Sequence, residues 1–200
     1  MLKDLFLPPT DERLSGLILA LPQIRVETGP LRDFVFYPQW SRLLDELGTL
    51  DDVGVAAMRI DHSGVFERAD PEHPCPPYET GYSPRGGHDA GMVVADLQEA
   101  YARFGLVPAE HRAPDHLSTE LEFVGALCSR EGEDGLAIVT AERAFLRSHL
   151  LRWLPQFATG IEAVRPGGPY SRAAETAAAF VGHDERLLAG LLALGGSEHG

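Results

Sequence analysis

The sequence predicts an all-α protein that forms one helical domain over residues 1–200. Apolar residues recur every three or four positions through most of the chain, which is the spacing of an amphipathic helix. Prolines and glycines stand between these stretches, where they would end one helix and let the next begin. The clearest β-prone run covers residues 34–37, but Pro38 follows it and no partner strand is apparent.

Four helices are expected before residue 69, separated by prolines, glycines and helix-capping residues. They cover residues 2–6, 10–21, 40–47 and 52–66. Pro8 and Pro22 would end the first two, and Gly48 would end the third. Asp51 or Asp52 has the side chain needed to cap the fourth helix at its N-terminus.

A long loop at about residues 69–88 should follow, because the stretch ADPEHPCPPYETGYSPRGG is dense in proline and glycine. Loops of this length in compact domains are often functional. The helices expected after the loop cover residues 93–104, 114–128, 136–150, 173–181 and 184–194, with a broken extension at 153–157. Gly105 is a candidate C-cap of the first of these helices, and residues 166–169 (PGGP) make the last break.

The charge balance argues against nucleic acid as a partner. The formal net charge is −13, whereas a phosphate backbone attracts a basic surface. An acidic surface suits a basic partner, although acidity for solubility alone explains the charge equally well. The two cysteines form no metal or redox motif, and Cys128 is expected to be a small core residue. With no export leader or membrane span apparent, the sequence predicts a cytoplasmic protein.

The familiar catalytic motifs are missing from the sequence. It contains no phosphate-binding glycine loop, no nucleophile elbow and no His-Glu-x-x-His zinc motif. Four His–Asp steps, at residues 61–62, 88–89, 115–116 and 183–184, leave open a helical metal-dependent hydrolase as the alternative. Adjacent residues on a helix point about 100° apart and rarely bind one ion together, so we predict no metal site and no enzyme.

Three stretches, taken together and in order, resemble the TorD/DmsD/NarJ superfamily of redox-enzyme maturation chaperones. They are CPPYETGY at residues 75–82, DLQEAYARFGL at 96–106 and PDHLSTELEF at 114–123. The second stretch departs from the family's pattern, because Ala100 stands where that pattern has an aromatic residue, which predicts a smaller packing contact. The resemblance extends over residues 53–157 and is greatest to chaperones of type II dimethyl-sulfoxide-reductase-like enzymes.

The resemblance implies a TorD-like helical bundle with no catalytic residues and no cofactor of its own. Its partner would be the apo catalytic subunit of a molybdopterin oxidoreductase, bound in the cytoplasm through a twin-arginine leader until the cofactor is inserted. Such a leader carries two guanidinium groups followed by an apolar stretch. Its receptor therefore needs carboxylates beside an apolar groove.

Nine residues from the three stretches are the candidate client-binding residues. They are Tyr78, Glu79, Tyr82, Phe104, Gly105, Asp115, His116, Glu120 and Phe123. The three carboxylates would meet the guanidinium groups, and the four large aromatic side chains would form apolar walls. His116 is the candidate for direct contact.

Each of these assignments has a purely structural alternative. Asp115 is well placed to cap the helix that follows it. Glu79 could pair with a nearby arginine such as Arg85, and Tyr78 and Phe104 could be core residues.

Overall fold

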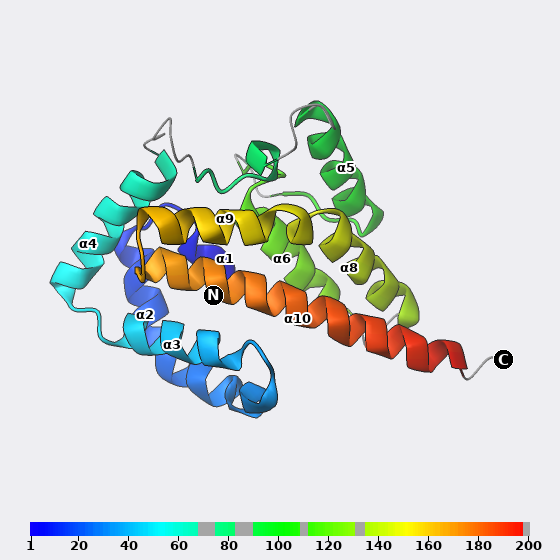
Figure 1. The fold of residues 1–200 in the computed structure, drawn as a ribbon, viewed down its shortest axis with the longest axis horizontal. Coiled ribbons are helices and arrows are strands. Elements are labelled where there is room, and N and C mark those ends of the chain that lie inside the picture. The colour runs from blue at the N-terminus through cyan, green and yellow to red at the C-terminus, as the bar shows by residue number, and fades with distance from the viewer. Residues whose placement is uncertain (68–74, 83–89, 109–111, 131–134, 198–200) are drawn as a thin grey trace. The chain divides into compact units, whose positions relative to one another are not determined.

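Helices make up nearly all of the regular structure in the computed structural model, which describes residues 1–67, 75–82, 90–108, 112–130 and 135–197 (Figure 1). The α-helices are α1 (Leu2–Leu5), α2 (Asp11–Glu27), α3 (Tyr37–Gly48), α4 (Asp52–His62), α5 (Ala90–Arg103), α6 (Leu117–Cys128), α8 (Leu136–Ser148), α9 (Leu150–Val164) and α10 (Pro169–Ser197). Two 3-10 helices cover Gly29–Asp33 and Glu79–Tyr82, and a π-helical turn covers Ser63–Glu67. No strand occurs in the described residues, so the all-α prediction is confirmed.

The described residues group into two compact units. The first contains Met1–Pro76 and Pro155–Phe180, and the second contains Pro77–Leu154 and Val181–Gly200. The expectation of a single domain over residues 1–200 stays a prediction. Of the expected loop at residues 69–88, residues 69–74 and 83–88 lie outside the described residues.

The first unit is built around the apolar face of α3. Trp40, Leu43, Leu44 and Leu47 are all buried, and their spacing places them on one side of the helix. The indole of Trp40 donates a hydrogen bond to Thr28 over 3.0 Å at the end of α2. Asp51 caps α4 by accepting a hydrogen bond from the Gly54 amide, as its position in the sequence predicts.

Aromatic rings fill the rest of this unit. One cluster contains the rings of Phe6, His62, Phe66, Phe157 and Tyr170, and another contains those of Phe34, Phe36 and Phe180. The Tyr170 hydroxyl donates to the Met58 carbonyl over 3.1 Å and so satisfies its one polar group in the core.

The second unit packs α5, α6 and α8 around a second aromatic cluster. Phe123 of α6 lies 4.8 Å from the Tyr101 ring and 4.6 Å from the Phe145 ring, measured between centroids. α6 and α8 pack against each other, with Leu127 and Leu146 fully buried (Figure 1). The expected C-cap is confirmed, because Gly105 has φ +69° just after α5 and the next amide returns to the Tyr101 carbonyl.

One helix passes through its expected stop. α2 was expected to end at Pro22, but it continues to Glu27. Pro22 is exposed, so the carbonyl that it deprives of a partner can bind water instead. The Arg25–Asp45 ion pair, 2.9 Å long, links the extra turn to α3. Tertiary contacts therefore outweigh the local preference of proline.

The two helices expected after residue 172 are a single helix. α10 runs for 29 residues through Gly182, which lies between the expected helices at 173–181 and 184–194. Val181 and Leu188 are both buried seven residues apart, which keeps one face of the helix against the second unit's core. The Glu185 carboxylate meets Arg143 of α8 at 3.0 Å.

None of the described helices is both long enough and apolar enough to cross a bilayer.

Gly182→Ala tests the continuity of α10. Alanine should stabilise the fold by about 0.5–1 kcal/mol, because glycine is unfavourable in a helix interior. The added methyl group would meet only Arg186 Nη1, at 3.7 Å, which is ordinary contact. Urea denaturation would measure the free energy of unfolding. A loss of stability would instead indicate a helix end at Gly182.

Candidate functional site

Two of the three candidate stretches meet in the second unit. The segment before the Glu79–Tyr82 helix lies antiparallel to the residues that open α6, with Tyr78 opposite His116. The Glu79 amide donates to the Asp115 carbonyl and the Leu117 amide donates to the Pro77 carbonyl, each over 2.9 Å. These two backbone hydrogen bonds hold together segments that are nearly 40 residues apart in the sequence.

The structure gives Asp115 and His116 local structural roles, and it contradicts the expected capping role of Asp115. Asp115 does not cap α6. The cap is His116, whose Nδ1 accepts a hydrogen bond from the Ser118 amide over 3.1 Å. The Asp115 carboxylate instead accepts a hydrogen bond from the Thr80 hydroxyl over 2.6 Å. Asp115 thus fastens the first stretch to the third, while His116 starts the helix.

Glu79 forms a buried pair with a residue that sequence reasoning missed. Its carboxylate lies 2.9 Å from Nδ1 of His149, and both side chains are at most 10% exposed. The partner that was expected for Glu79, Arg85, lies outside the described residues. His149 separates α8 from α9, because its backbone dihedral angles, φ −122° and ψ −91°, are not helical. Local sequence could not reveal a partner 70 positions away.

Glu120 is the most deeply buried carboxyl group of the site. It is 0% exposed, and its Oε2 accepts a hydrogen bond from the Trp153 indole over 3.4 Å. Its Oε1 has no hydrogen-bond partner in the part of the chain that the structure describes. Burial raises the pKa of Glu120 well above its usual value, and the nearby charge of Glu79 raises it further. Glu120 is therefore held as a neutral acid at pH values where an exposed glutamate is ionised.

The aromatic candidates surround this polar network. The Tyr82 ring stacks on Trp153 at 5.3 Å, and the Tyr78 ring meets His116 edge-on at 5.0 Å. The Phe104 and Phe123 rings lie 5.9 Å apart. Tyr101, which was not a candidate, is buried beside them and donates to the Pro114 carbonyl over 2.7 Å.

Burial divides the nine candidates into two groups, which corrects the expectation of carboxylates exposed beside a groove. Glu79, Asp115, His116, Glu120 and Phe123 are buried. Tyr78 is 38% exposed, Gly105 is exposed, and Tyr82 and Phe104 are half-buried. Solvent therefore reaches Tyr78, Tyr82, Phe104 and Gly105 far more than it reaches the acids.

Two hollows open beside the aromatic candidates. One, of about 360 Å³, lies between the end of α5 and α6 and is lined by Tyr101, Leu106, Val107, Pro108, Thr119, Glu122, Phe123 and Ala126. The other, of about 290 Å³, lies along α5 and α8 and includes Phe104, Phe123, Phe145 and His149. Ala100 lines the second hollow, at the position where sequence reasoning predicted a smaller packing contact.

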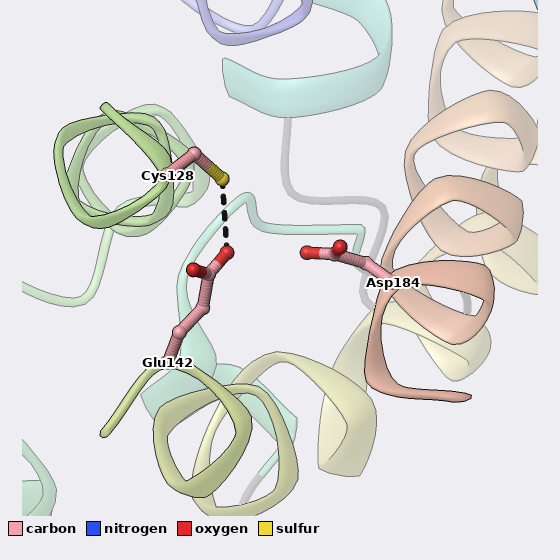
Figure 2. Close-up of side chains that lie close together, drawn as sticks. All are labelled: Cys128, Glu142 and Asp184. Carbon is pink, nitrogen blue, oxygen red and sulfur yellow. Dashed lines mark hydrogen bonds between the residues drawn. The ribbon is translucent and has the colours of Figure 1, made fainter. Parts of the chain in front are cut away.

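A separate polar cluster lies on three other helical positions of the same unit. Figure 2 shows Cys128 of α6, Glu142 of α8 and Asp184 of α10 pointing toward one another, with their polar atoms within 4.8 Å. Cys128 is exposed rather than a core residue, and its thiol donates to the Glu142 carboxylate over 2.9 Å. Among the described residues this is the sole group of three potential ligands, and it contains no histidine. Asp184 belongs to the His–Asp step at residues 183–184, and no residue of the steps at 61–62 or 115–116 joins this cluster.

Glu120→Gln should change how stability depends on pH. The raised pKa means that the folded protein keeps a proton that the unfolded chain releases near pH 4.5. The contribution of the Glu120 carboxyl to the free energy of unfolding is therefore fully present below pH 4.5. It is lost as the pH rises toward the pKa of Glu120 in the folded protein. The free energy of unfolding of the parent protein, relative to that of Glu120→Gln, should fall by up to about 1.4 kcal/mol per pH unit above pH 4.5.

Urea denaturation at successive pH values would measure this difference. Glu12→Gln, at an exposed position in the first unit, is the matched control and should run parallel to the parent. Parallel curves for Glu120→Gln as well would show that the buried carboxyl is not held neutral.

A family model described as nitrate reductase delta subunit matches residues 36–159 of the chain. This range contains all nine candidate residues.

Individual relatives of the chain are named as chaperone proteins. A chlorate reductase assembly chaperone protein of Ideonella dechloratans is 34% identical over 62% of this chain and 67% of its own length. A selenate reductase assembly chaperone protein of Thauera selenatis is 33% identical over the same shares. The chaperone protein TorD of Vibrio atlanticus is 26% identical over 76% of this chain and 75% of its own length.

A solved structure supports the fold. It comes from Archaeoglobus fulgidus and is described as a redox enzyme maturation protein. It matches with a TM-score of 0.58 over 90% of this chain and 88% of the other, at 20% identity. A likeness at that identity concerns the fold alone.

Proposed function

The chain belongs to the nitrate reductase delta subunit family, which includes the TorD- and NarJ-type chaperones, and on this basis we propose that it is an assembly chaperone without catalytic activity. Its client in this proposal is the apo catalytic subunit of a molybdopterin oxidoreductase. The protein binds that subunit in the cytoplasm through its twin-arginine leader and delays export until the cofactor is inserted. The observation that carries the proposal is the family match, because it spans every candidate residue and relatives within it are named as assembly chaperones.

The charge of the chain supports a basic partner. The formal net charge of −13 would attract a leader that carries two arginines. Long-range attraction of this kind raises the association rate more than it raises the final affinity. The apolar stretch of the leader then needs aromatic surface, which half-buried Tyr82 and Phe104 and exposed Tyr78 offer.

The buried candidates have an indirect part in this proposal. Glu79, Asp115 and His116 fix the backbone on either side of Tyr78 through the hydrogen bonds described above. They act as positioning residues, while the exposed aromatic side chains make contact with the client. A surface that is rigid before binding pays less conformational entropy when the leader docks.

Tyr78→Ala should weaken leader binding and leave the fold intact. The side chain is 38% exposed, so its loss removes contact area from the surface and opens no internal cavity. A central tyrosine of an interface commonly contributes more than 1 kcal/mol, which corresponds to roughly a fivefold or greater rise in Kd. Calorimetry with a synthetic peptide of about 20 residues, containing two adjacent arginines and an apolar stretch, would measure it.

Two further variants complete this experiment. Leu19→Ala removes an 81% exposed side chain from α2 and should not change the Kd. Asp115→Ala with His116→Ala should weaken binding and also lower the melting temperature, because both side chains are buried and hydrogen-bonded. If the parent protein does not bind the peptide, and does not co-purify with an apo molybdoenzyme subunit, the proposed function is wrong.

A further inference from the structure

The hollow along α5 and α8 has an aromatic floor because its walls carry small side chains. Three phenylalanines, Phe104, Phe123 and Phe145, line it. Ala100, Ala141 and Ala144 stand where larger side chains would close it. Its volume of about 290 Å³ is close to the lower end of the range for small-ligand pockets, roughly 300–1,000 Å³, so it suits a single side chain.

The polar groups of this hollow are mainly hydrogen-bond acceptors. Asp96, at its rim, is exposed and makes no ion pair with the other described residues. The cation on the same rim, Arg103, is already bound to Glu99 over 2.6 Å. Ser148 adds a hydroxyl group, which can accept as well as donate.

His149 supplies a further acceptor. Its Nδ1 faces the Glu79 carboxylate at 2.9 Å, which places the proton of the neutral ring on Nδ1. Nε2 is then the lone-pair nitrogen of a side chain that lines the hollow. A ligand that donates several hydrogen bonds and carries a positive charge would satisfy these groups.

We propose that this hollow seats one arginine side chain of the client's leader, a proposal that rests on the proposed function. The guanidinium lies over the phenylalanine rings, and its N–H groups donate to Asp96 and to Nε2 of His149. The aliphatic stem of the arginine covers the alanine walls. The occupant is thus a cation on an aromatic face, with a carboxylate to balance its charge.

The protein itself contains one example of this chemistry. The Arg130 guanidinium carbon lies 5.8 Å from the centre of the Phe104 ring, and its Nη1 donates to the Phe104 carbonyl. Phe104 therefore already binds a guanidinium, and Phe123 and Phe145 provide further aromatic surface in the hollow. Arginine suits this environment better than lysine, because its planar group stacks on aromatic rings and is less strongly hydrated.

The larger hollow offers a weaker fit to a cation. It is lined mainly by apolar side chains, and its one carboxylate, that of Glu122, is engaged with Arg112. Its lining also reaches Pro108, next to residues 109–111 that lie outside the described part of the chain.

The test fills the hollow with a larger side chain and measures whether the Kd for the leader peptide still depends on its arginines. Ala100→Phe should raise the Kd for the synthetic twin-arginine peptide about tenfold or more, because its ring occupies the space of the guanidinium. Replacing one of the two peptide arginines by alanine should weaken binding to the parent protein by a similar factor. The same replacement should have little further effect on Ala100→Phe, because interacting sites are not additive.

Three more variants guard against a folding defect and a general surface effect. Asp96→Asn changes only an exposed side chain and should weaken binding several-fold, with a smaller salt dependence. Asp33→Asn, an exposed acid in the first unit, is its matched control and should leave the Kd unchanged. Ala102→Phe adds the same ring to an exposed position of α5 that does not line the hollow and should also be neutral.

The outcomes separate this inference from the proposed function. If the parent protein binds the peptide but Ala100→Phe and Asp96→Asn bind it equally well, the seat is elsewhere and the chaperone proposal stands. Additive effects of Ala100→Phe with each arginine replacement would likewise overturn the arginine seat. Failure of the parent protein to bind the peptide at all would overturn both proposals.

Discussion

Three carboxyl groups, those of Glu79, Asp115 and Glu120, are buried within one unit of the chain, and each has to be compensated. Glu79 has the His149 ring and Asp115 has the Thr80 hydroxyl. Glu120 has one weak hydrogen bond from Trp153 and otherwise avoids the cost of a buried charge by keeping its proton. These partners come from the 3-10 helix, from the junction of α8 and α9 and from the first turn of α9, so the network ties together segments that no local rule would join.

This network determines what the neighbouring surface can do. A buried, hydrogen-bonded polar pair such as Glu79 and His149 adds little net stability compared with well-packed apolar side chains, since desolvation offsets most of the attraction. Its effect here is geometric. The backbone bridge to His116 positions Tyr78, whose ring contacts the His116 ring. His149, which lines the α5–α8 hollow, is held by Glu79. Acids inside the unit thereby set the positions of aromatic and imidazole groups that line its accessible surface.

Local rules predicted the helices well where backbone chemistry alone decides. The Asp51 cap and the positive φ of Gly105 follow from residue type and position. The same rules were wrong at Pro22 and Gly182, where ion pairs and buried side chains from other helices keep the helix continuous. The all-α class survives such errors, because each changes a boundary and not the period of the apolar pattern.

The site was harder to predict because its roles depend on distant partners. Aspartate is a common N-cap, so Asp115 was the natural choice, yet the Thr80 hydroxyl engages its carboxylate and leaves the cap to His116. Carboxylates are rarely buried, so Glu79 and Glu120 were expected at the surface. The resemblance to a family identified these residues as a group but not their burial. His149 and the hollow above it require knowledge of which helices meet.

A chaperone that must release its client has a physical reason for this division between core and surface. If buried acids met the leader directly, binding would require their exposure or the full desolvation of two guanidinium groups, and release would be slow. In the proposed function, an accessible surface of aromatic rings with an exposed carboxylate such as Asp96 would bind a basic segment with less desolvation. Under that proposal, the buried network would keep one geometry when the client departs, because the Glu79–His149 and Thr80–Asp115 hydrogen bonds need not break.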